Sequence, residues 1–160
     1  MSTQRYNKGV AMLELVVGLT IITISLSALL NNYKAHVRAA LANTQEVKAS
    51  YLAEETLEVV RFLRDSGWTS NIASLTNGTT YYLYWTGSTW VSTTTAQYVD
   101  DLSRSFIVSA VNRDSNDDIV ASGGTLDSGT KKIDVTVAWR PTQATTTKTI
   151  STYLTNLFSN

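Results

Sequence analysis

The sequence predicts an α+β protein in which one long N-terminal α-helix packs on a small antiparallel β-sheet. The prediction rests on three successive compositions along the 160 residues. Residues 10–30 are almost entirely apolar, residues 31–66 are charged and contain neither Gly nor Pro, and residues 67–160 are rich in Thr, Ser, Tyr and Trp. A chain of this length supports one ordinary domain with an appendage. We therefore expect an anchor, a stalk and a head.

Charge and residue content exclude several classes of function. The 13 basic and 13 acidic residues balance, whereas a protein that neutralises nucleic-acid phosphates normally carries a basic excess. The absence of cysteine excludes disulfides, thiolate metal sites and cysteine nucleophiles. The single histidine, His36, falls near the end of the apolar run and far from the head. We expect no catalytic activity, no cofactor and no nucleic-acid partner.

The apolar run of residues 10–30 has the length of a membrane span. As a helix its 21 residues cover roughly 30 Å, the thickness of a bilayer core. Arg5 and Lys8 in the preceding polar segment place that segment in the cytoplasm by the positive-inside tendency. Three interpretations remain open: a secretory signal peptide, whose apolar core is normally shorter, a permanent anchor, or a helix that enters first a membrane and then a filament.

Glu14 is the one charge in this run. A carboxylate inside a membrane span requires a partner; the alternative is that Glu14 lies near enough to the membrane surface to stay hydrated. It is the fifth residue after Gly9, which Lys8 precedes, and the apolar residues 15–17 and Gly18 follow it. This pattern resembles the class III signal of type IV prepilins and type II secretion pseudopilins. The resemblance implies that a membrane peptidase cuts between Gly9 and Val10 and N-methylates Val10. It also implies that Glu14 pairs with the N-terminal ammonium of a neighbouring subunit and sets the register of assembly.

The same resemblance favours a minor subunit over the major one. Asn31 stands where many major pilins have proline, and the chain cannot form their C-terminal disulfide. The stretch LAEETLE at residues 52–58 is similar to minor pilins and pseudopilins. The implied partners are other pilin subunits, the prepilin peptidase and methyltransferase, and the assembly platform in the membrane. The implied location is the cytoplasmic membrane, with the leader inside, and afterwards a cell-surface pilus.

The stalk continues the apolar segment as one helix over residues 10–64. Apolar side chains recur there at steps of three or four, which is the spacing of one helical face. Residues 65–67 end the helix, with Gly67 as a C-cap. The predicted division is a leader at 1–9, a membrane or filament-core helix at 10–30, an amphipathic half at 31–66 and a head at 67–160. The predicted face consists of Val37, Leu41, Thr44, Val47, Tyr51, Leu52, Thr56, Val59, Val60 and Leu63.

The head is predicted to contain about five antiparallel strands, because short β-prone runs there are separated by turn signals. In one of these runs Ile133, Val135, Val137 and Trp139 alternate onto a single face. The helix face that ends at Leu63 supplies the surface that one side of the sheet needs. The predicted strands are residues 80–85, 90–94, 106–111, 133–139 and 149–157.

One site hypothesis for the head is a calcium-binding loop. Asp114, Asn116 and Asp118 open like a calcium loop, but Ile119 and Thr125 stand where that motif has glycine and an acid. A solvated hairpin loop is the favoured interpretation, with weak calcium binding as the alternative.

The alternative to filament assembly is a single-span surface protein whose head binds a ligand and which never assembles. Trp85, Trp90 and Trp139, if exposed, would suit a carbohydrate-binding face. Trp139 alternates with core-like positions, so we expect it to be packed inside the head.

Overall fold

The structure, a computed structural model, describes residues 3–139 and 145–157, with side chains from residue 9 onward. Helix α1 (Thr3–Ser66) is unbroken and begins before the predicted start at Val10. The chain divides into two compact units, Met1–Asn43 and Thr44–Asn160. The first unit is helical wherever it is described, and the second holds the end of α1 together with all the strands. The four-part division predicted from composition is finer than this and stays a prediction.

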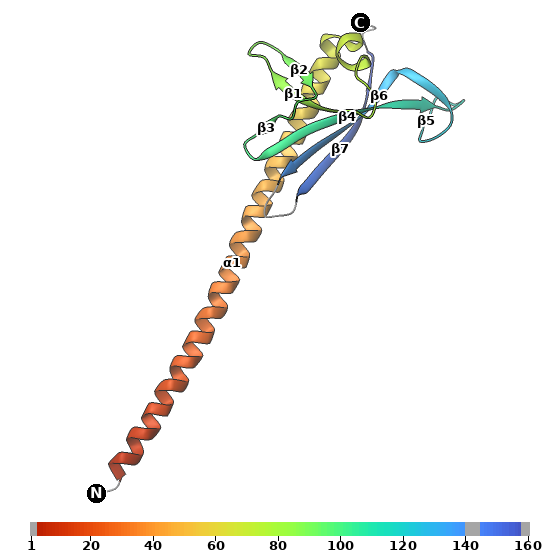
Figure 1. The fold of residues 1–160 in the computed structure, drawn as a ribbon. Coiled ribbons are helices and arrows are strands. Elements are labelled where there is room, and N and C mark those ends of the chain that lie inside the picture. Colours follow the sequence, from red (N-terminus) through yellow and green to blue (C-terminus); the bar gives the residue numbers. More distant parts are fainter. Residues whose placement is uncertain (1–2, 140–144, 158–160) are drawn as a thin grey trace. The chain divides into compact units, whose positions relative to one another are not determined.

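The head is an antiparallel sheet with the strand order β2-β1-β4-β6-β7. Figure 1 shows β4, β6 and β7 side by side. The short strands β3 and β5 both pair with β4. Together with the C-terminal part of α1, this sheet confirms the predicted α+β fold class. The strands are β1 (Thr80–Trp85), β2 (Trp90–Thr93), β3 (Tyr98–Val99), β4 (Leu102–Arg113), β5 (Ile119–Val120), β6 (Thr125–Trp139) and β7 (Thr146–Thr155).

Each of the five predicted strands has a counterpart, but the structure adds to them. The two-residue strands β3 and β5 were not predicted, because two residues are too few for an alternating pattern. Strands β4 and β6 begin earlier than predicted, at Leu102 and Thr125. A short π-helical turn, η1 (Thr69–Ala73), follows α1 where the helical pattern was expected to have stopped.

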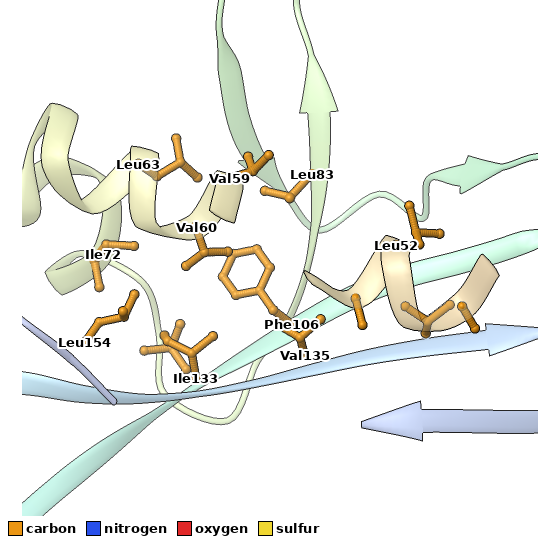
Figure 2. Close-up of a cluster of buried hydrophobic side chains, with 14 of the residues drawn as sticks. Leu52, Val59, Val60, Leu63, Ile72, Leu83, Phe106, Ile133, Val135 and Leu154 are labelled. Atoms are coloured by element: carbon orange, nitrogen blue, oxygen red, sulfur yellow. The ribbon is translucent and has the colours of Figure 1, made fainter. Parts of the chain in front are cut away.

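The core lies between the C-terminal part of α1 and one face of the sheet. Figure 2 shows helix side chains such as Val60 and Leu63 gathered with strand side chains such as Phe106 and Val135. Phe106 is fully buried and stands opposite Val135 in the β4–β6 register. The prediction that one face of β6 is buried is confirmed, since Ile133, Val135, Val137 and Trp139 are all buried.

The buried helix face differs in part from the predicted one. Leu52, Thr56, Val59, Val60 and Leu63 are buried as expected. The Thr56 hydroxyl donates to the carbonyl of Leu52 at 2.6 Å, which satisfies it inside the core. The positions that bring the helix against the sheet also include two small residues, and five predicted members of the face are exposed instead. The added residues are Ala49 and Ala53, and the exposed ones are Val37, Leu41, Thr44, Val47 and Tyr51.

Candidate functional site

The apolar segment at residues 10–30 has no cover within the described chain. All 13 of its large apolar side chains are exposed, by between 49% and 72%. The helix that contains it is the one helix among the described residues that is long and apolar enough to cross a membrane. A helix that is apolar on every side requires lipid or other helices around it.

The hydroxyl groups of this segment are satisfied within the helix. Thr20 donates to the Val16 carbonyl at 2.7 Å, and Thr23 donates to the Leu19 carbonyl at 2.7 Å. Ser25 and Ser27 make the same bond to the carbonyls of Ile21 and Thr23, each at 2.8 Å. Such bonds to the preceding turn let hydroxyl residues occupy a helix in an apolar medium without water.

Glu14 is the exception among the polar side chains of this segment. Its carboxylate is exposed and makes no hydrogen bond or ion pair with any described residue. Gly9, Val10 and Glu14 all lie on α1, and Val10 and Glu14 are four residues apart, on one helical face. Cleavage after Gly9, methylation of Val10 and pairing of Glu14 stay predictions.

The predicted calcium candidates lie in the loop between β4 and β5. Asp114 Oδ1 accepts hydrogen bonds from the backbone amides of Asn116 at 2.9 Å and Asp118 at 3.0 Å. These bonds form a side-chain-stabilised turn, and Asp117 adopts a positive φ of 68° within it. Among the described residues, no group of three or more His, Cys, Asp or Glu side chains is placed to hold a metal ion. Calcium binding stays a prediction.

Arg113 holds this loop against β6. Its Nε donates to Asp127 Oδ2 at 2.7 Å, and its Nη1 donates to the Asp117 carbonyl at 2.7 Å. The hydrogen bond from Arg113, assisted by Thr130, holds the pKa of Asp127 below its ordinary value of 3.8. The same hydrogen bond raises the pKa of Arg113. Arg113 therefore links the loop to β6 through these two hydrogen bonds.

A cleft of about 390 Å³ lies between α1 and the β1–β2 hairpin. Its aromatic lining is Phe62, Trp85 and Trp90. The two tryptophan rings have centroids 5.3 Å apart and planes inclined by 58°. Trp139 is buried, which confirms that it is a packing residue. The cleft therefore contains two of the three tryptophans that were considered for a binding face.

Arg104 beside this cleft is a residue that the sequence analysis missed. It is buried, and its Nη1 donates to Glu55 Oε1 at 2.7 Å. Its guanidinium carbon lies 5.0 Å from the centroid of the Trp90 ring, while its Nε has no hydrogen-bond partner in the described structure. The alternation of Leu102, Arg104 and Phe106 would have placed Arg104 on the core face if β4 had been extended backwards.

The comparisons with protein-family models, with curated proteins and with solved structures found no match for the chain. The fold and the segment just described are the remaining evidence on the class of protein. The chain has a single apolar helix near its N-terminus and an antiparallel β head. That combination is compatible with a pilin-like fold.

Proposed function

We propose that this protein is a structural subunit of a type IV pilus or of a pilus-like filament of type II secretion. It is made as a precursor anchored in the cytoplasmic membrane by residues 10–30. It is cleaved after Gly9, N-methylated at Val10 and assembled through the same helix. The head then forms part of the filament surface.

The observation that carries this proposal is that the Glu14 carboxylate has no partner among the described residues, whereas the hydroxyl groups of the same apolar segment are all hydrogen-bonded. The hydroxyls of residues 10–30 bond to their own helix, so Glu14 is the polar side chain that still needs a partner. A carboxylate within a membrane span costs on the order of 2.5–3.5 kcal/mol. A plain anchor has no use for such a group, whereas a neighbouring subunit's N-terminal ammonium would offset its desolvation.

The pair would also define the axial register between subunits. Thirteen large apolar side chains cover the segment on all sides, and apolar contacts alone permit neighbouring helices to slide. A single buried ionic contact selects one arrangement, which is the best-attested role of buried polar groups. The proposed partners are other subunits, a prepilin peptidase with methyltransferase activity and a membrane assembly platform. We propose no catalytic activity for the chain.

The test is replacement of Glu14 in native cells. Glu14→Ala should leave membrane insertion intact, since it removes a charge from the span, but it should abolish incorporation into sheared filaments. Glu14→Asp should restore part of that incorporation because it keeps the charge. The matched control is Glu54→Ala, which removes an exposed glutamate from the other part of the same helix. Normal incorporation of Glu14→Ala would contradict the proposal.

The second candidate function is a membrane-anchored surface protein that binds a ligand and does not assemble. The aromatic cleft with Trp85 and Trp90 favours it. This candidate predicts that the leader stays attached and that Glu14→Ala behaves as the natural chain does.

A further inference from the structure

The cleft at Trp85 and Trp90 is open to the surface and has the volume of a small-molecule site. Its volume of about 390 Å³ falls within the range of about 300–1,000 Å³ that ligand pockets occupy. Trp85 and Trp90 face each other as the last pair of the β1–β2 register. Helix α1 supplies the opposite wall with Glu55, Glu58 and Phe62.

The aromatic wall is held in place before any ligand arrives. The turn after Trp85 is closed by Thr86, whose backbone amide donates to the Thr89 carbonyl at 3.0 Å. The Thr86 hydroxyl donates to the same carbonyl at 3.0 Å, and the Thr89 amide donates to that hydroxyl at 3.2 Å. Three bonds across one turn hold the ends of the hairpin at a defined separation. A preorganised wall reduces the entropy that binding would lose.

Charge decides what kind of ligand the cleft suits. Glu55 is paired with Arg104, and Glu58 is paired with Arg61. The two carboxylates and two guanidinium groups therefore sum to zero, so the cleft attracts neither a cation nor an anion strongly. Each carboxylate remains more than half exposed and keeps acceptor sites for further hydrogen bonds. The lining therefore combines aromatic surface with ionised, charge-balanced hydrogen-bonding groups.

The Trp90 ring is already occupied by a cation of the chain itself. The best position for a cation is over a tryptophan face, and Arg104 already lies over Trp90. Trp85, by contrast, is 48% exposed and offers apolar area to a ring of matching size.

We propose that this cleft binds the pyranose ring of a neutral saccharide. The C–H face of the sugar stacks on Trp85, and its hydroxyls donate hydrogen bonds to Glu55 and Glu58. The cleft shares Trp85 and Trp90 with a second one of about 220 Å³, which Arg104 and Gln97 also line.

The experiment uses the full chain in lauryldimethylamine oxide, a detergent without a sugar headgroup. The probes are methyl β-galactopyranoside, methyl α-mannopyranoside, N-acetylglucosamine and cellobiose, each titrated against tryptophan fluorescence. Trp68 and Trp139 are buried, but Trp139 also lines a separate cavity, so variants of the cleft decide whether a change reports on Trp85 and Trp90. Saturable binding of at least one probe is the expected result. Saccharide binding does not depend on assembly, so failure here leaves the filament proposal standing.

Matched variants locate the binding. Trp85→Ala should weaken the affinity by about tenfold or more, because it removes the stacking surface. Tyr153→Ala is the control, since Tyr153 is an aromatic residue on β7 with the same exposed fraction of 48%. Glu58→Gln keeps the shape of the side chain and should weaken binding less than Trp85→Ala does. Far-ultraviolet circular dichroism checks that each variant is folded.

Three outcomes would overturn the proposal. The first is that none of the four probes binds. The second is binding that Trp85→Ala leaves unchanged while the variant is folded. The third is saturation of the same fluorescence change by tetramethylammonium with no response to any sugar, which would reassign the cleft to cations.

Discussion

The two parts of α1 differ in whether their apolar side chains are buried within the chain. Between residues 10 and 30 every large apolar side chain is exposed, whereas Leu52, Val59, Val60 and Leu63 near the helix end are buried against the sheet. The backbone is the same continuous helix in both parts. The difference lies in the pattern: the second part is apolar on one face and the first is apolar all round.

This contrast indicates that the head is complete without the apolar segment. Burial of one large apolar side chain is worth about 1.5–3 kcal/mol, and the head obtains this from residues within Thr44–Asn160. The apolar segment obtains none of it from its own chain. Its stabilisation has to come from lipid or from other helices, and this is the physical basis of the filament proposal.

The largest expected effect comes from a substitution that destabilises only the head. Phe106→Ala should lower the free energy of unfolding of the head by about 3–5 kcal/mol, because it leaves a cavity in the core. Urea unfolding followed by tryptophan fluorescence measures this, since all four tryptophans belong to the head. Phe62→Ala is the matched control: Phe62 is 51% exposed, and its loss should change stability by no more than about 0.5 kcal/mol. Both variants should still insert into membranes.

The converse change damages only the apolar segment. Ile22→Arg should raise the free energy of membrane insertion by about 2.5–3.5 kcal/mol, because it places a charge near the middle of the span. The measurement is the fraction of protein that stays with carbonate-washed membranes. Val47→Arg adds the same charge at an exposed apolar site in the second unit. Equal loss from the membrane in both variants would show that residues 10–30 are not the anchor.

The same substitution, alanine to leucine, should have a smaller effect that differs between the two parts of α1. Ala53→Leu should destabilise the head by about 1–3 kcal/mol, because Ala53 is fully buried and the core has no room for the added atoms. Ala28→Leu makes the same change at an exposed position of the apolar segment and should strengthen insertion slightly. Urea unfolding and membrane fractionation measure the two effects. A neutral result for Ala53→Leu would mean that the helix does not approach the sheet closely there.

The smallest expected effect is a pH dependence confined to the head. The pKa of Asp127 is lower in the folded state, so its pairing with Arg113 stabilises the protein above pH 3.8 and is lost as the pH falls below that value. Asp127→Asn should reduce the pH dependence of the free energy of unfolding in this acid range, as urea unfolding at several pH values measures. Asp118→Asn, at an exposed site in the neighbouring loop, should not. Asp134 keeps some acid dependence in both variants. Its burial raises its pKa, but hydrogen bonds from Ser151 and Lys132 outweigh this and lower it overall.

Much of the fold could be predicted because its signals are local. The helix contains no proline, and its apolar positions have helical spacing. The alternation from Ile133 to Trp139 identified the buried face of β6. The small residues Ala49 and Ala53 were missed because alanine carries little hydrophobic signal, although a close helix–sheet contact selects it. Tyr51 was expected on the buried face and is exposed, because aromatic character does not by itself specify burial.

The candidate sites could be predicted only in part. Glu14 stands out in the sequence because it is the single charge in an apolar run. The cleft does not, since it brings Glu55 and Phe62 of the helix to Trp85 and Trp90 of the hairpin. That proximity depends on tertiary packing, and no spacing rule in one sequence reports it.

The measurement that tests the central claim most directly is the N-terminal mass of the protein recovered from native membranes and from sheared filaments. The account predicts a chain that begins at N-methylated Val10 in the filaments. A chain that retains the leader and begins at Met1 or Ser2 in every fraction would contradict it, and would favour a membrane-anchored binding protein instead.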